Sequence, residues 1–165
     1  MRTGYRDLEG QSMVKVKLGD DVIQSKILFK VRFDYRGEHK PGRFLFGGKS
    51  IELMAEENRE EKVTLLKNLP VQGVSFKDYD ITPEPYVVYD DNLGERVAYA
   101  PAVITVQADS IEDMVKFIMR EEFRKLEVLE PSQMFITNKD LERVLFKMNE
   151  ELRKQLLVYS NKIKR

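Results

Sequence analysis

Residues 27–35 read ILFKVRFDY, and this stretch decides the fold class. Apolar side chains occupy every second position from Ile27 to Tyr35, while most of the intervening positions carry charged side chains. Such strict alternation is typical of a β-strand with one face in the core and the other toward solvent. We therefore predict a long, half-buried strand here, within a mostly antiparallel sheet.

Weaker patterns on both sides of this strand predict the rest of the sheet. Residues 14–18 alternate in the same way, and the turn signal at residues 19–21 predicts that they form a hairpin with the long strand. Residues 90–94 have the composition of a second hairpin turn. Further strands are expected at residues 71–76, 86–89 and 97–108, and at either 126–131 or 133–136.

Three segments have the apolar spacing of helices. The first begins near Ser50 and ends at Leu69, but its middle is wholly polar, so it could consist of two pieces with Asn58 capping the second. The second runs from Ile111 to about Leu126, after a Ser110 cap. The third and longest runs from residue 138 to about residue 162, behind a capping-box pattern at residues 137–140.

This order of elements predicts an α+β fold, with a mostly antiparallel sheet packed on one face by about three helices. The strand–helix–strand segment at residues 102–136 could form a parallel crossover. Residues 1–12 have little apolar periodicity, so we expect a loose N-terminal leader followed by a single domain at residues 13–165.

Composition excludes several classes of function. The chain has 165 residues with no cysteine and one histidine, which excludes disulfides, thiol catalysis and multi-histidine metal sites. We therefore expect neither a metal nor a cofactor. No apolar run has the length of a membrane span, so we expect a cytoplasmic protein without a membrane partner. Abundant Glu and Lys without Cys or Trp would also suit a heat-tolerant source.

The most suggestive motif is the glycine-rich loop Gly47-Gly48-Lys49-Ser50, directly before the first helix. Backbone N–H groups at a helix start can bind anions, and Arg43 and His39 could add positive charge. The pattern lacks the first glycine of a nucleotide-binding P-loop. The alternatives are therefore a site for a small anion and an ordinary turn capped by Ser50.

An acidic segment and a single glutamate are further candidate sites. Residues 78–91 hold five carboxylates, which could attract a hard cation, but their spacing fits no calcium loop and suits solvated loop acids. Glu122 falls within the apolar stripe of the second predicted helix. A carboxylate buried there could act as an acid or base, whereas a position near the helix end would make it structural.

The C-terminal helix carries the clearest signal for an interaction. We expect its main apolar stripe to pack on the rest of the protein. Phe146, Leu157 and Val158 lie off this stripe, and a helix packed on one face does not need them. A second contact surface, such as that of a symmetric dimer, would bury them. The stripe consists of Leu141, Val144, Leu145, Met148, Leu152, Leu156, Tyr159 and Ile163.

Three classes of function remain open. We favour a non-catalytic protein that self-associates or binds a ligand, using its C-terminal helix for contact with a second copy or a partner. One alternative is an enzyme or sensor that binds a phosphate- or carboxylate-bearing molecule at the loop at residues 47–50. The other is a nucleic-acid accessory protein with a basic N-terminal half and a basic C-terminal tail, although equal numbers of basic and acidic residues argue against it.

Overall fold

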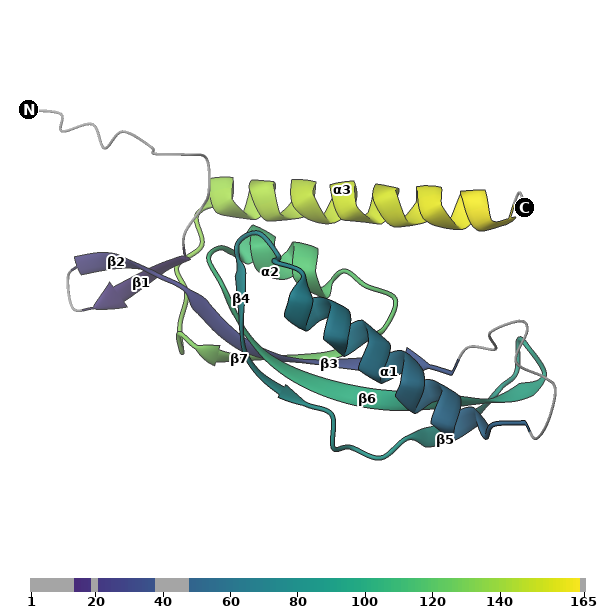
Figure 1. Cartoon of the computed structure of the whole chain (residues 1–165). Coiled ribbons are helices and arrows are strands. Elements are labelled where there is room, and N and C mark those ends of the chain that lie inside the picture. Colours follow the sequence, from purple (N-terminus) through teal and green to yellow (C-terminus); the bar gives the residue numbers. More distant parts are fainter. Residues whose placement is uncertain (1–13, 19–20, 38–47, 164–165) are drawn as a thin grey trace, which may run out of the picture.

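The computed structural model describes residues 14–18, 21–37 and 48–163. Seven strands and three helices are assigned within these ranges, and the class is α+β as predicted (Figure 1). In chain order, the elements are β1 (Val14–Leu18), β2 (Asp21–Ser25), β3 (Ile27–Arg36), α1 (Ile51–Asn68), β4 (Val74–Asp80), β5 (Tyr86–Asp90), β6 (Glu95–Ala108), α2 (Ile111–Ile118), β7 (Phe123–Glu130) and α3 (Asn138–Ile163).

The main sheet is antiparallel throughout, in the order β4-β6-β3-β7. The C-terminal half of β6 pairs with β4 and its N-terminal half pairs with β5, so β4 and β5 share one edge of the sheet. Strands β3 and β4 both run antiparallel to β6, so they are parallel to each other, and α1 connects them. Strands β6 and β7 both run antiparallel to β3, so they are also parallel to each other, and α2 connects them. Two β-α-β units are therefore interleaved, which is the split β-α-β arrangement of the ferredoxin-like topology. The predicted parallel crossover between β6 and β7 is confirmed.

The helices lie on one side of this sheet, as expected. Figure 1 shows α1 and α2 against the same face, with α3 lying beyond α2. The buried face of β3 is the one that its alternation predicted, from Ile27 to Tyr35. Phe117 of α2 packs into this core. Its ring makes edge-to-face contacts with the rings of Phe33 and Phe76, at centroid distances of 5.7 and 5.6 Å.

The prediction that residues 14–18 form a hairpin with the long strand β3 was wrong. Strand β1 pairs with β2, which lies between β1 and the long strand in sequence, and these two form a separate two-stranded sheet. Strand β3 instead pairs with β6 on one side and β7 on the other. A strand buried on one face gains more by joining two long neighbours than by folding back on a short one.

The first helix is continuous, and its polar middle is used for packing. Asn58 and Arg59 are buried against the sheet rather than exposed. The Asn58 side chain donates a hydrogen bond to the carbonyl of Arg36 at 2.8 Å. The Arg59 guanidinium donates to the carbonyls of Pro83 and Pro101 at 2.7 and 3.0 Å. The predicted break at Asn58 was therefore wrong.

The second helix is shorter than predicted, since it ends at Ile118 instead of Leu126. The Met119 N–H closes its last turn by donating to Val115, and the Arg120 N–H donates to the carbonyl of Ile118. Residues from Phe123 onward then pair with the otherwise open edge of β3. Sheet pairing has overridden the helical pattern of this segment. The strand expected at residues 71–76 is likewise shifted, because β4 begins at Val74.

Candidate functional site

Part of the glycine-rich loop lies outside the described residues, including His39, Arg43 and Gly47. In the described part, the Lys49 ammonium is paired with the carboxylate of Glu57. The Ser50 hydroxyl accepts the N–H of Leu53 at 3.2 Å and so caps α1. Gly48 has open space where a Cβ would lie. The lysine and the serine thus have structural partners, and the anion site at this loop stays a prediction.

The acidic residues of the β4–β6 region stabilise turns. The Asp80 carboxylate accepts hydrogen bonds from the N–H and the hydroxyl of Thr82, and these bonds lower the pKa of Asp80. The Asp90 carboxylate accepts the N–H groups of Asn92 and Leu93 in the β5–β6 turn. Among the residues with described positions, no three metal-ligating side chains come close enough together to hold a metal ion.

Glu122 does not lie on a helix, which corrects the expectation that it interrupts the stripe of the second helix. It lies in the loop between α2 and β7, where its carbonyl accepts the N–H of Asp34 at 2.8 Å. Burial raises the pKa of the Tyr35 phenol, and the nearby Glu122 carboxylate raises it further. Glu122 is thus part of the rim around a buried tyrosine.

A polar cluster on the other face of the sheet is not visible in the sequence pattern. Asp34 is 2% exposed, although it lies on the face that the helices leave open. Its carboxylate accepts from the Arg32 guanidinium at 2.7 Å and from the Tyr86 hydroxyl at 2.6 Å, and Arg124 lies 3.6 Å away. Every charge in this cluster has a partner. The cluster therefore stabilises the packing of β5 and β7 against β3.

The long helix α3 begins at a reciprocal capping box. The Asp140 carboxylate accepts the N–H of Thr137 at 2.9 Å, and the Thr137 hydroxyl accepts the N–H of Asp140 at 3.2 Å. Hydrogen bonding by Thr137 lowers the pKa of Asp140, so the carboxylate remains charged in the first turn of the helix. The predicted capping pattern is confirmed.

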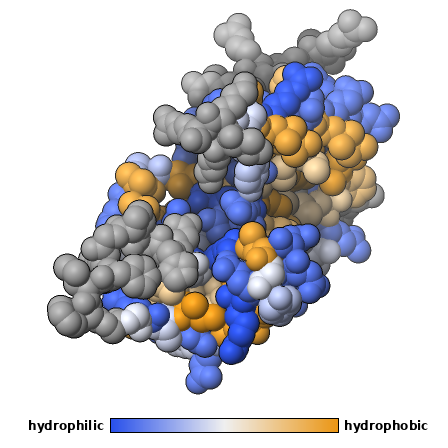
Figure 2. Space-filling model, turned by 90° about the vertical axis from the view of Figure 1, so that its right-hand side faces the viewer, coloured by the Kyte–Doolittle hydropathy of each residue, from blue (hydrophilic) through white to orange (hydrophobic). Residues whose placement is uncertain are grey.

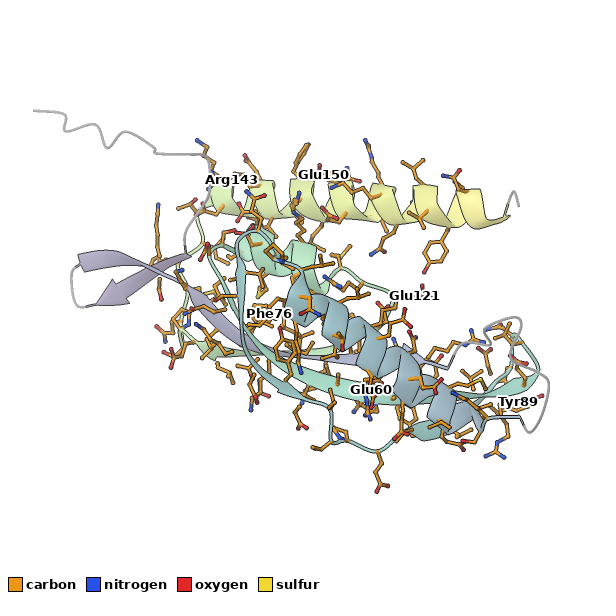
Figure 3. The ribbon with its side chains drawn as sticks, viewed as in Figure 1. Glu60, Phe76, Tyr89, Glu121, Arg143 and Glu150 are labelled. Atoms are coloured by element: carbon orange, nitrogen blue, oxygen red, sulfur yellow. The ribbon has the colours of Figure 1, made fainter. Side chains whose placement is uncertain are left out.

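Among the described residues, a mostly polar face of α3 meets the rest of the protein. Arg143 pairs with Glu112 of α2 at 3.4 Å, and the Gln155 side chain donates to the carbonyl of Met119 at 2.6 Å. Figure 3 shows Glu121 in the α2–β7 loop beneath the C-terminal half of α3. A hydrogen bond with Glu121 raises the pKa of the Tyr159 phenol. The half-buried residues along this face are Asp140, Val144, Lys147, Glu151 and Gln155.

Most of the apolar stripe of α3 is exposed, so the prediction that it packs on the protein was wrong for all of its described side chains except Val144. All but one of the half-buried residues of α3 are followed directly by an apolar one, the exception being Glu150, and successive residues of a helix differ by about 100° in direction. The stripe is therefore turned about a quarter of a circle away from α2. Six of its side chains are between 41% and 59% exposed, and they are Leu141, Leu145, Met148, Leu152, Leu156 and Tyr159, although the Tyr159 hydroxyl also bonds to Glu121. Val144 of the predicted stripe is half-buried.

The side chains predicted to form an interface are also exposed. Phe146, Leu157 and Val158 are 72%, 64% and 55% exposed. Phe146 and Leu157 each directly follow a residue of the stripe, so they lie a further 100° around the helix. Figure 2, which faces the C-terminal end of α3, shows hydrophobic side chains gathered at the top of the molecule where α3 lies. We name the stripe together with Phe146 and Leu157 the α3 apolar surface.

The charged residues of α3 are mostly paired within the helix. Lys147 and Lys154 each lie within 4 Å of both Glu150 and Glu151, with a closest approach of 2.6 Å between Lys147 and Glu150. Such exposed pairs stabilise a helix only weakly, because water and salt screen them. Lys154 is thus partly neutralised, and the basic residues at 164 and 165 lie outside the described ranges. Binding of nucleic acid by this tail stays a prediction.

Comparison with known proteins found no family model, no curated protein and no solved structure that matches this chain. Within the described ranges, none of the helices combines the length and the apolar character needed to cross a membrane. The functional proposal therefore rests on the geometry of the described residues.

Proposed function

We propose that the protein is a non-catalytic, self-associating protein in which α3 pairs with α3 of a second copy. The observation that supports this most is the exposure of six side chains of the α3 stripe between Leu141 and Tyr159. A continuous row of large apolar side chains is costly to leave in water, and burying it stabilises an assembly by about 25 cal/mol per Å². Isolated exposed apolar residues are ordinary, but a row at helical spacing is not.

The spacing of the stripe favours a second copy of this chain over an unrelated partner. Counted from Leu152, apolar residues lie 4, 7 and 11 positions before it and also 4, 7 and 11 positions after it. Two antiparallel helices that cross at Leu152 would thus place each apolar residue at the height of another. Met148 of one copy would lie beside Leu156 of the other, and Leu145 would lie beside Tyr159. A sequence that is symmetric about its centre suits a two-fold axis.

The orientation of α3 leaves room for this partner. Its polar face holds α2 through Arg143 and Gln155, and the stripe is turned about 100° away from that face. A second copy can therefore approach without displacing α2. With 26 residues, α3 is about 39 Å long, so the pairing would run along one side of each molecule. Phe146 and Leu157 would lie at the margin of the contact.

The test compares the stripe with the surface beside it. We expect Leu145→Glu with Leu152→Glu to convert a dimer to a monomer, because four carboxylates would be forced into an apolar contact. The matched variant, Phe146→Glu with Leu157→Glu, adds the same charge at the margin and should weaken association less. Sedimentation equilibrium measures both, and circular dichroism checks that these exposed substitutions leave the fold intact.

Two results would contradict this proposal. A wild-type chain that sediments as a monomer at all concentrations would remove self-association altogether. A dimer that survives the stripe substitutions but dissociates with Phe146→Glu and Leu157→Glu would show that a different face of α3 makes the contact.

A further inference from the structure

A cleft lies between α1 and α2, at the opposite end of α1 from the glycine-rich loop. Its volume is about 590 Å³, within the range of small-molecule sites. The C-terminal half of α1 forms one wall, and α2 with the loop that follows it forms the other. In Figure 1 the end of α1 lies next to α2. Because the loop at residues 47–50 precedes α1, the cleft is a separate place in the fold.

Positive charge dominates the lining of this cleft. Lys62 of α1, Lys116 of α2 and Arg120 of the α2–β7 loop all line it, whereas Glu122 is the one acidic residue of the lining. Neither lysine forms an ion pair with any residue that the structure describes. The two lysines are therefore available to an anion.

Arg120 is held in position before any ligand arrives. Its Nε donates to the carbonyl of Phe117 at 2.9 Å, and its guanidinium carbon lies 4.9 Å from the ring centroid of the same residue. No described residue accepts a hydrogen bond from its terminal nitrogens. An arginine fixed by its Nε and its stacking loses little freedom when these nitrogens bind a carboxylate or a phosphate.

The remaining lining suits the uncharged part of a ligand. Tyr35 lines the cleft and is 3% exposed. Burial raises the pKa of its phenol, which therefore keeps its proton as a hydrogen-bond donor. Leu65, Leu66 and Val71 add an apolar wall beside it. Apolar walls with a few convergent polar groups are the usual composition of a small-molecule site.

We propose that this cleft binds a small organic anion. The carboxylate or phosphate of the ligand would lie between Lys62, Lys116 and Arg120, and its apolar portion would lie against the leucines of α1. Glu122 at the rim would weaken the binding of anions that carry more than one charge. This site is independent of the pairing of α3 and uses none of the residues of the α3 apolar surface.

The experiment titrates the full chain with three probes, phenyl phosphate, benzoate and inorganic phosphate, and follows backbone amides by NMR. We expect phenyl phosphate and benzoate to saturate at millimolar concentration or below and inorganic phosphate to bind more weakly, because it lacks an apolar portion. The shifted amides should be those around Tyr35, Leu66 and Arg120. No saturable binding of either aromatic probe would overturn the proposal, and so would shifts confined to Lys49 and Ser50.

Three variants locate the binding. Lys62→Ala with Lys116→Ala should weaken phenyl phosphate at least about tenfold, because two charge-assisted contacts are lost. Glu122→Gln should strengthen it by removing a repulsive charge. Lys125→Ala is the matched control, since Lys125 is an exposed lysine of β7 that lies opposite Arg32, away from the cleft. Unchanged affinity in the double-lysine variant would overturn the proposal. The oligomer mass should be the same in all three, so the two proposals fail separately.

Discussion

At the scale of single residues, buried polar groups fix how α1 docks on the sheet. Arg59 is 6% exposed, and it satisfies the carbonyls of two prolines that belong to different strands or loops. Pro101 lies within the central strand β6, opposite Asp34, where it offers no N–H to the ladder. The guanidinium therefore links the helix to the strand at the position where a proline occupies the sheet.

We expect Arg59→Met to lower the free energy of unfolding by about 2–3 kcal/mol, because buried carbonyl oxygens would lose their donors. Urea unfolding followed by circular dichroism measures this change. Arg96→Met is the control, since Arg96 is exposed on β6 and should change stability by no more than about 0.5 kcal/mol. Equal effects of the two substitutions would contradict the role given to Arg59.

Tyr35 makes stability depend on pH in the alkaline range. Its pKa is raised in the folded protein by burial, whereas in the unfolded chain it ionises near pH 10. The contribution of Tyr35 to the free energy of unfolding is thus fully present below pH 10 and is lost as the pH rises beyond it, with a slope that approaches about 1.4 kcal/mol per pH unit. Unfolding in urea at pH 9 and 11 should show a larger loss for the wild type than for Tyr35→Phe. Equal losses would show that Tyr35 ionises freely when folded.

At the scale of elements, local patterns predicted the type of most strands and helices. They did not predict the ends of these elements, because tertiary contacts determine where an element ends. The alternation of β3 and the capping box of α3 are local signals, and both hold. Residues 119–126 have a helical pattern, yet α2 ends before them and β7 begins at Phe123, where the chain pairs with the edge of β3. The polar middle of α1 was misread for a similar reason. The partners of Asn58 and Arg59 are backbone carbonyls far away in the sequence.

The capping box of α3 should control the fraying of that helix alone. We expect Thr137→Ala to cost about 1 kcal/mol locally, because the first N–H groups of the helix lose their acceptor. Hydrogen exchange should become faster at the first-turn amides of α3 and remain unchanged in β3 and β6. Faster exchange throughout the sheet would show that α3 and the sheet unfold as one unit, contrary to its docking through few polar contacts.

A chain that stops before α3 should still fold. The described contacts of α3 reach α2 and the α2–β7 loop, while the core lies between the sheet, α1 and α2. We expect residues 1–137 to keep a dispersed NMR spectrum with a lower melting temperature, and to be monomeric. A truncated chain with the same oligomeric state as the full chain would contradict the role of α3 in association.

At the scale of the whole molecule, the exposed stripe distinguishes this protein from a split β-α-β domain whose helices all pack on the sheet. The sequence places apolar residues on one face of α3, and that pattern alone suggested a buried face. The structure shows that α2 meets the neighbouring polar face instead. Periodicity in the sequence reveals that a helix face is apolar, but it does not reveal whether the same chain or a second molecule covers that face. The cleft proposed to bind an anion has no signal in the sequence, because the charges that line it come from three separate elements.

The central claim is the antiparallel pairing of α3, and the absence of cysteine from the chain makes it directly testable. Leu145→Cys and Tyr159→Cys chains are mixed, oxidised and weighed intact by mass spectrometry. Antiparallel helices that cross at Leu152 place these two positions side by side, whereas identical positions lie about 21 Å apart. Antiparallel pairing predicts a mixed disulfide between the two variants as the main product. Only disulfides between identical chains, or no covalent dimer at all, would contradict it.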